Sequence, residues 1–237
     1  MTATQRNHLT VSMRTCAEPA DFPAISDFLY GLYQPLNRDG NWLQPIWEYA
    51  YTHPWFDEQS VQRIGIWEDS GTIVGVTLYE LRLGEAFFQI HPAYTHLKSE
   101  MLAYAEQHLT GTTDEGKRYL KAYVSDFDTA FEHAVRSRGY EKEPGSHRPM
   151  SHLVIPQPFP PIRLPDGFRL KSLADDNDLY KVDRVLWRGL NHPGEPPADG
   201  PEGRRKMQFR PNHSTTPLRR RSYSTTRSKG VSVSTGT

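Results

Sequence analysis

The sequence predicts an α/β (α+β) fold, a mixed and mostly antiparallel sheet flanked by helices, and three observations lead to this class. Apolar residues recur at spacings of three and four in several segments, as on one face of an amphipathic helix. Runs of β-branched and apolar residues lie on both sides of the turn-rich tetrad Glu68–Gly71, which is typical of a hairpin. Strand-like and helix-like segments also mix along the chain instead of forming separate blocks.

One strand and two helices are expected first. The alternating run Leu9–Arg14 suits a strand. A helix is expected over Pro19–Gln34 because its apolar residues share one face: Phe22, Ile25, Phe28, Leu29 and Leu32. The aromatic segment Trp42–Trp55 suits a second helix, which Pro54 helps to end.

Three strands and a third helix follow. Val61–Trp67 and Thr72–Leu83 are the arms of the expected hairpin. Ala86–His91 is the next strand, and Pro92 stops it because proline cannot donate to a ladder. Helical spacing returns over Leu97–Leu109.

The same alternation continues to residue 155. Tyr119–Val124 reads as a buried strand and Asp126–Arg138 as a helix, with Gly139 at the position of a C-terminal cap. Tyr140–Lys142 and Ser151–Ile155 are expected to be the last short strands. The predicted order is therefore βααβββαβαββ, with one parallel crossover.

A Pro-rich connector predicts a domain boundary. Residues 1–156 form the first expected domain, and the linker at 157–165 holds Pro158, Pro160 and Pro161, which cannot continue a sheet. Residues 166–212 look like the beginning of the chain again. We interpret them as the opening elements of a second, incomplete domain of the same kind.

The evidence for this repeat is an offset of about one domain length. At a shift of 157 residues, Val11–Arg14 matches Phe168–Lys171, and Asp21–Tyr30 matches Asp178–Trp187 in its apolar positions. The alternative is that any strand followed by an amphipathic helix would match equally well.

The last 25 residues, 213–237, have a different composition. Twelve of the 25 are Ser or Thr, and few are apolar, so a disordered basic tail is expected. One alternative is a basic arm for nucleic acid or acidic lipid. Another, which the abrupt loss of apolar pattern favours, is an out-of-frame or truncated end of a longer two-domain protein.

Charge and composition exclude several classes of function. Nine basic and no acidic residues lie in 203–237, which leaves 19 basic and 28 acidic residues in 1–202, a net charge of −9. A body of that charge is a poor nucleic-acid binder. Cys16 is the only cysteine, which excludes an internal disulfide and a cysteine-based zinc cluster. Neither a membrane span nor a signal peptide is found, so the sequence predicts a soluble cytoplasmic protein.

The element order and two local stretches give residues 1–156 a resemblance to a known family. Ile90–Tyr94 is an apolar-x-Pro-x-aromatic run that leads into a helix, and Ala134–Tyr140 ends a helix in a Gly-aromatic pair. In these respects the chain resembles the GNAT acyl-CoA N-acyltransferases, and the repeat makes it similar to tandem members with a truncated second domain. The resemblance implies acetyl-CoA as co-substrate and no metal.

In that family a Gly-rich loop and the following helix N-terminus hold the pyrophosphate of acyl-CoA. The resemblance carries this role to Ile90, Tyr94, Thr95, His96, Leu97, Lys98 and Ser99. The loop departs from the pattern, because it has no glycine and Thr95 stands where the family has arginine. Glu100 in the first turn is expected to repel a phosphate, and Lys98 to compensate in part.

The catalytic assignments also come from the resemblance. The family's acid, a tyrosine four residues before the Gly-aromatic pair, falls on Val135, which cannot donate a proton. Tyr140 is adjacent, and Glu85 could order a water that deprotonates an amine. These two are the candidate catalytic residues. His91, His96 and His108 do not make a metal-ligand pattern, so no metal is expected.

Two functions from different classes stay open, and a third is disfavoured. The first is an N-acetyltransferase acting on a small-molecule amine, with weak or absent activity in this chain. The second is a non-catalytic scaffold or regulatory domain of a truncated tandem acetyltransferase. The third, a nucleic-acid or membrane binder that acts through the tail, is opposed by the acidic body. The rings between Trp42 and Phe56 form either a substrate wall or core packing, and the oligomeric state is left open.

Overall fold

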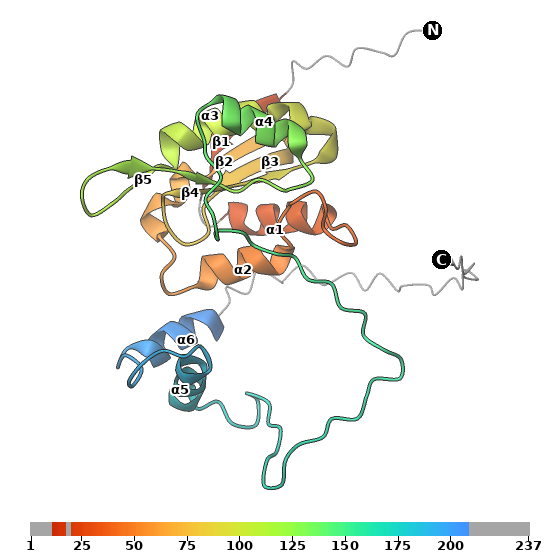
Figure 1. The fold of residues 1–237 in the computed structure, drawn as a ribbon, viewed down its shortest axis with the longest axis vertical. Coiled ribbons are helices and arrows are strands. Elements are labelled where there is room, and N and C mark those ends of the chain that lie inside the picture. Colours follow the sequence, from red (N-terminus) through yellow and green to blue (C-terminus); the bar gives the residue numbers. More distant parts are fainter. Residues whose placement is uncertain (1–10, 18–19, 209–237) are drawn as a thin grey trace.

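A five-stranded sheet organises the structure, a computed structural model that describes residues 11–17 and 20–208 (Figure 1). The strand order is β1-β2-β3-β4-β7, antiparallel except for the last pair, in which β4 and β7 are parallel. The strands of this sheet are β1 Val11–Thr15, β2 Gly65–Asp69, β3 Thr72–Leu78, β4 Glu85–Ile90 and β7 Lys121–Ala122.

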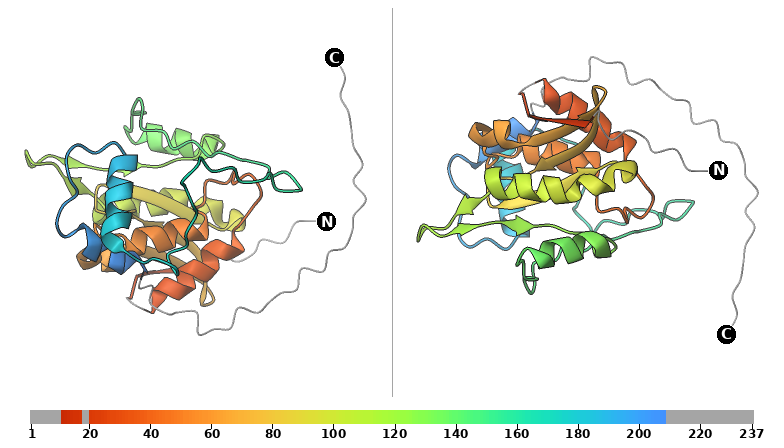
Figure 2. Two further views of the ribbon diagram at one scale, coloured as in Figure 1. Left: turned by 90° about the horizontal axis from the view of Figure 1, so that it is seen from below. Right: turned by 90° about the horizontal axis from the view of Figure 1, so that it is seen from above.

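Helices cover both faces of this sheet (Figures 1 and 2). Helices α1 (Asp21–Gly31) and α2 (Gln44–Thr52) lie on one face, and α3 (Lys98–His108) and α4 (Thr129–Ser137) lie on the other. The mixed class with a mostly antiparallel open sheet and flanking helices is therefore confirmed. Among the described residues there are also two 3₁₀ helices and a two-stranded sheet: η1 Glu58–Arg63, η2 Pro92–Leu97, β5 Gly111–Thr112 and β6 Arg118–Tyr119.

The expected hairpin forms, with shorter arms than the sequence suggested. Ser70 and Gly71 both take positive φ, 52° and 79°, as a tight turn between two strands requires. The first arm begins at Gly65, because Val61 belongs to η1. The second arm ends at Leu78, after which the hydroxyl of Tyr79 donates to the carbonyl of Asp57 at 2.5 Å.

Two strands expected near the end of the first domain are absent. Tyr140–Lys142 and Ser151–Ile155 lie in a stretch, 138–178, that contains no helix or strand. Their short runs have nothing to pair with, since β7 pairs with β4 through only two residues and offers no long free edge. Only short pieces of the expected strand Tyr119–Val124 find partners. Tyr119 pairs in β6 with β5, and Lys121–Ala122 pair in β7 with β4.

The C-terminal part of the described chain is a helix pair. The expected second-copy helix is α5 (Leu179–Gly189), whose first turn is capped by Asp178, and α6 (Gly200–Gln208) follows it. The expected strand Phe168–Lys171 is not formed, and these residues are irregular and exposed. The tail at 213–237 lies outside the described residues.

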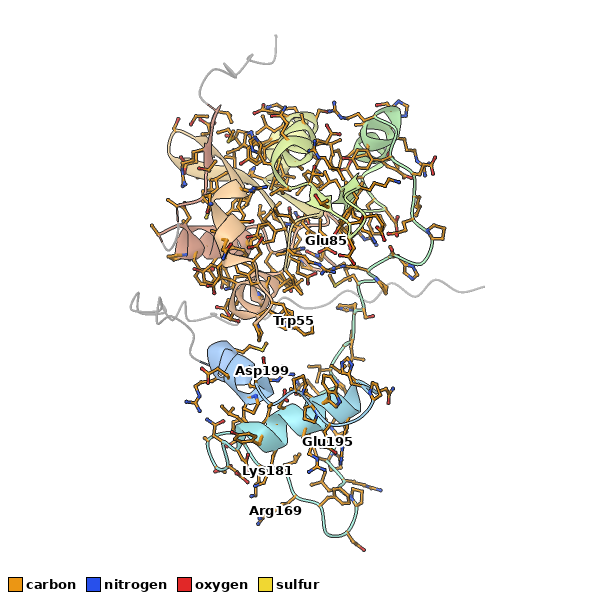
Figure 3. All side chains as sticks on the ribbon, turned by 90° about the vertical axis from the view of Figure 1, so that its left-hand side faces the viewer. Trp55, Glu85, Arg169, Lys181, Glu195 and Asp199 are labelled. Atoms are coloured by element: carbon orange, nitrogen blue, oxygen red, sulfur yellow. The ribbon has the colours of Figure 1, made fainter. Side chains whose placement is uncertain are left out.

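The helix pair meets the main body at α2 (Figure 1). A Cβ atom placed on Gly203 would lie 2.7 Å from Cγ of Pro54, so α6 approaches the end of α2 closely. Figure 3 shows Trp55 and Glu85 in the main body, with Lys181, Glu195 and Asp199 in the separate helical unit. Within that unit, Arg204 pairs with the buried Asp183 at 3.0 Å.

The buried apolar residues of the described chain belong to the main body, from Cys16 to Val135. Most of the aromatic segment before Phe56 packs there. Trp47 is fully buried and stacks on Phe22 at a centroid distance of 5.5 Å. Tyr49 and Trp55 are exposed. Core packing therefore accounts for the centre of this cluster.

Candidate functional site

A cavity of about 530 Å³ opens where α3 and α4 begin, beside the end of β4. Five of the seven residues assigned to acyl-CoA by resemblance line it: Ile90, Thr95, His96, Lys98 and Ser99. The opposite wall comes from α4 and the residues before it, including Phe127, Asp128, Phe131 and Ala134. Residues distant in the sequence thus meet at one end of the sheet.

The cavity exists because β4 and the segment after β7 diverge. The parallel pairing covers only Glu85 with Lys121 and Ala86 with Ala122. Among the described residues, the last backbone bond from this segment to β4 runs from the Tyr123 N–H to the Ala86 carbonyl at 3.0 Å. By the alternation of an antiparallel ladder, Phe88 and Ile90 turn their N–H and C=O groups toward this opening.

Asn41 closes the opening at one point. Its side-chain nitrogen donates to the Ile90 carbonyl at 3.0 Å, and its oxygen accepts from the Ile90 N–H at 2.7 Å. The next residue, Trp42, donates its N–H to Oε1 of Gln89 at 2.5 Å. The loop between α1 and α2 is thereby fixed to the end of β4.

Lys98 has an internal partner. Its ammonium donates to the carboxylate of Asp128 and lies 5.4 Å from the ring centroid of Phe131. Asp128 also caps α4 by accepting from the Phe131 N–H at 3.0 Å. Lys98 is only 9% exposed, and its ammonium is paired with Asp128. This ion pair holds α4 against α3 and leaves little of the positive charge for a ligand.

Glu100 does not face the cavity. Its Oε1 accepts from the indole Nε1 of Trp67 at 2.8 Å, across to β2. This carboxylate points away from the cavity, so the expectation that it repels a phosphate bound there is wrong. Met101 and Leu102, the next residues, are fully buried and fix the rotation of α3 that turns Glu100 away.

Arg38 is the cation that sequence reasoning missed. It lines the cavity, and its guanidinium carbon lies 5.5 Å from the ring centroid of Phe127. Within the described chain it forms no salt bridge, which leaves its donors available to an anion. Arg38 lies in the irregular loop after α1, where no periodic pattern marks it as a site residue.

The remaining two residues assigned to the cofactor lie elsewhere. The hydroxyl of Tyr94 donates to Oδ2 of Asp69 at 2.6 Å, and Leu97 is buried in the core. The first backbone groups of η2 are also occupied, since the Ala93 N–H donates to Nδ1 of His91 at 3.3 Å. Side chains, more than free backbone N–H groups, therefore offer the polar contacts of this cavity.

Neither candidate catalytic residue lines the cavity. Glu85 begins β4 and Ile90 ends it, so the two are roughly 16 Å apart at the usual strand rise. The Glu85 carboxylate accepts from the Tyr123 hydroxyl at 3.4 Å. Val135, at the position of the family's acid, is a buried core residue.

Tyr140 lies near the other end of α3. Burial, and after it the neighbouring Glu106 carboxylate, together raise the pKa of its hydroxyl to about 12. Arg138 holds Glu106 in an ion pair and lowers the pKa of that carboxyl group. The Tyr140 hydroxyl is thus bound to Glu106, away from the cavity.

The described residues contain neither a metal-ligand cluster nor a helix able to span a membrane. No three histidine, cysteine or carboxylate side chains in 11–17 and 20–208 gather where they could hold a metal ion. In the same residues no helix combines the length and the apolar character needed to cross a bilayer.

The whole chain matches no protein-family model and no curated protein.

Proposed function

We propose that the first domain is of the GNAT type: it binds acyl-CoA, with acetyl-CoA the expected form, and transfers the acyl group slowly to a small-molecule amine. The observation that carries this proposal is the cavity at the start of α3 and α4, which five of the seven residues assigned by resemblance line. It adjoins a parallel strand pair that opens immediately after Ala86.

The order of the sheet supports the same proposal. Four antiparallel strands are followed by a helix, α3, and then by a strand parallel to β4. As far as α4 this succession is compatible with the order that the resemblance implies, apart from the added hairpin of β5 and β6. The last two strands of the implied order are not formed, and β7 stays a two-residue edge strand.

The cavity suits the phosphates of the co-substrate through a small number of contacts. Arg38 supplies a guanidinium, and Thr95 and Ser99 supply hydroxyl donors. Lys98 is shared with Asp128, whose carboxylate also lines the cavity and opposes an anion. We therefore expect weak binding.

The reaction itself needs few groups. The amine nitrogen attacks the thioester carbonyl, the C–N bond forms, the C–S bond breaks, and the amine proton ends on the thiol. Glu85, outside the cavity lining, is the carboxylate that the resemblance offers to accept that proton through water, whereas Val135 supplies no acid for the thiolate. A missing acid typically costs about 10² to 10⁴ in rate.

The second candidate is a non-catalytic scaffold or regulatory domain. Two contacts favour it. Asn41 binds both backbone groups of Ile90, and Glu106 interacts with the hydroxyl of Tyr140, so these groups stabilise the fold and are not available to a reaction. Acyl-CoA binding without release of free thiol in the presence of amines would select this candidate.

Calorimetric titration of the 237-residue chain with acetyl-CoA tests the proposal. We expect weak, saturable binding that Arg38→Ala weakens about tenfold, the effect of one charge-assisted contact. Arg82→Ala is the matched control, since Arg82 is exposed and outside the cavity lining. No saturable binding by the wild type, or equal losses in both variants, would refute the assignment of this cavity.

A further inference from the structure

Two stacked rings and a carboxylate hold the guanidinium of Arg148. The rings of Phe87 and Tyr123 are nearly parallel, with centroids 4.2 Å apart and planes at 7°. The guanidinium carbon of Arg148 lies 5.0 Å from the first centroid and 4.7 Å from the second. Its Nη2 lies 2.6 Å from Oε2 of Glu80, which makes an ion pair. This is a cation held beside two aromatic rings and by one negative charge.

This cluster lies on the side of β4 opposite the cavity. Phe88 packs edge-on against Phe131 of α4 at 5.0 Å, so Phe87, the preceding residue, faces the layer of α1 and α2. There the ring of Trp42 approaches Phe87 to 4.8 Å. One strand therefore carries the two sites on its two faces.

A second carboxylate borders the cluster. The Tyr123 hydroxyl lies 3.4 Å from Oε1 of Glu85, which places the candidate base beside the ring that contacts the cation. Glu80 is the better shielded partner of the ion pair, with a side chain 16% exposed against 46% for Arg148. Phe87 lies in β4, and Glu80 and Tyr123 lie just after the ends of β3 and β7, so the receiving groups belong to the sheet and its ends, and the cation comes from a separate segment.

Arg148 is delivered by a weakly attached segment. It lies within 138–178, where no helix or strand forms, and its neighbours His147 and Pro149 are exposed. The nearest attachment on the N-terminal side is the exposed ion pair of Lys121 with Glu143 at 2.8 Å. Exposed pairs of this kind contribute little to stability, so the segment can leave while the sheet stays intact.

We infer that Phe87, Tyr123 and Glu80 form a binding site for the guanidinium or ammonium group of a separate cationic ligand, a site that Arg148 fills as an internal occupant. The inference of a cation site is independent of the cavity. Its extension, that the ligand is the acceptor amine, rests on the proposed function.

The tether explains how such a site stays selective. A group on a short flexible segment acts at an effective concentration of about millimolar, so weak external cations do not displace it. A ligand that adds contacts beyond the cationic group would displace Arg148. Replacing Arg148 removes the competitor and exposes the binding of a simple cation.

The test measures calorimetric binding of butylguanidinium to the full chain, with butylurea as an uncharged probe of similar shape. We expect Arg148→Ala to bind butylguanidinium at least tenfold more tightly than the wild type, with no comparable gain for butylurea. Adding Glu80→Gln to Arg148→Ala should remove at least tenfold of that affinity. Arg188→Ala, a substitution of an exposed arginine of α5 in the separate helical unit, should behave as the wild type.

Two outcomes would overturn the inference. One is equal binding of butylguanidinium and butylurea by Arg148→Ala. The other is no gain over the wild type in a variant that urea unfolding shows to be folded, with Arg148→Gln as the second such variant. The same samples are titrated with acetyl-CoA separately. Cation binding without acetyl-CoA binding would keep the site and reject only its role as an acceptor site.

Discussion

Asn41 occupies both backbone hydrogen-bonding groups of Ile90, with bonds of 3.0 Å to the carbonyl and 2.7 Å from the N–H. Both residues are 2% exposed. One side-chain amide therefore replaces a neighbouring strand at the point where the segment after β7 has left the edge of β4. The bond pair connects the loop after α1 to the site, and its loss has a measurable cost.

Asn41→Ala should lower the free energy of unfolding by about 2–4 kcal/mol, because two buried backbone groups lose their partner. Urea unfolding measures it. Gln34→Ala, at an exposed position of the same loop, should stay within about 0.5 kcal/mol of the wild type. A loss for Asn41→Ala no larger than that of the control would contradict the contact.

The ion pair of Lys98 with Asp128 should couple the two positions energetically. Lys98→Met keeps the length of the side chain, and Asp128→Asn keeps a good helix cap while removing the charge. In a double-mutant cycle we expect a coupling of about 1–3 kcal/mol, since the pair is largely buried. Urea unfolding of the four proteins gives the value, and additive losses would show that the pair does not hold α4 on α3.

Asp21 should make the first helix sensitive to acid. Burial by itself raises the pKa of this carboxyl group, but the hydrogen bonds from Arg14 and from the Ala17 N–H outweigh burial and hold the pKa below its ordinary value of 3.8. A lowered pKa in the folded state gives stability above the ordinary value, and this stability is lost as the pH falls through the lowered one.

The wild type should therefore lose more free energy of unfolding between pH 5 and pH 2.5 than Asp21→Asn does, as urea unfolding across this range would show. At pH 7 the variant should be less stable by about 1–3 kcal/mol. Asp27→Asn, at an exposed position of the same helix, is the control and should follow the wild-type curve. Parallel curves for the wild type and Asp21→Asn would refute the role of this carboxylate.

Local pattern was enough to predict the elements that pack on the core. The apolar spacing in 98–108 and the tetrad before Thr72 are properties of neighbouring residues, and both elements formed near their expected positions. The local sequence of Ser151–Ile155 is equally strand-like, but it forms no strand, because a strand also needs a long free edge to pair with. Whether such an edge exists depends on β7, not on residues 151–155.

The residues of the site likewise fall into those that the local sequence could predict and those that it could not. The Thr95–Ser99 wall follows a strand directly and could be assigned from the sequence. Arg38 and Asn41 reach the site from a loop without periodicity, and their partners are about 50 or more residues away in the chain. The direction of Glu100 depends on Trp67 in β2, a contact that no local pattern contains.

Glu100→Gln should leave the affinity for acetyl-CoA within about twofold of the wild type. The carboxylate is bonded to Trp67 and turned away from the cavity, and glutamine retains an oxygen that can accept from the indole N–H. A carboxylate facing the phosphates would instead give a clear gain on neutralisation. Calorimetric titration decides between these results, with Arg38→Ala measured beside it as the variant expected to weaken binding.

The main body should keep its stability without the helix pair. Every residue of the buried apolar cluster lies between Cys16 and Val135, so α5 and α6 add nothing to that core. Their described contact with the main body is the small one between Gly203 and Pro54. A chain ending at Pro156 should therefore unfold cooperatively, with a free energy of unfolding within about 1 kcal/mol of the full chain.

Urea unfolding followed by tryptophan fluorescence tests this, with Trp187 of α5 replaced by Phe in the full chain so that the signal comes from the main body, where Trp47 and Trp67 are buried. Gly203→Leu in the full chain is the companion variant. It should separate α6 from α2, since a side chain at this position has no room beside Pro54, without lowering the midpoint of the core transition. A truncated chain that unfolds without cooperativity, or a clear fall in the core midpoint in Gly203→Leu, would mean that the helix pair belongs to the first folding unit and that the domain boundary at 157–165 is misplaced.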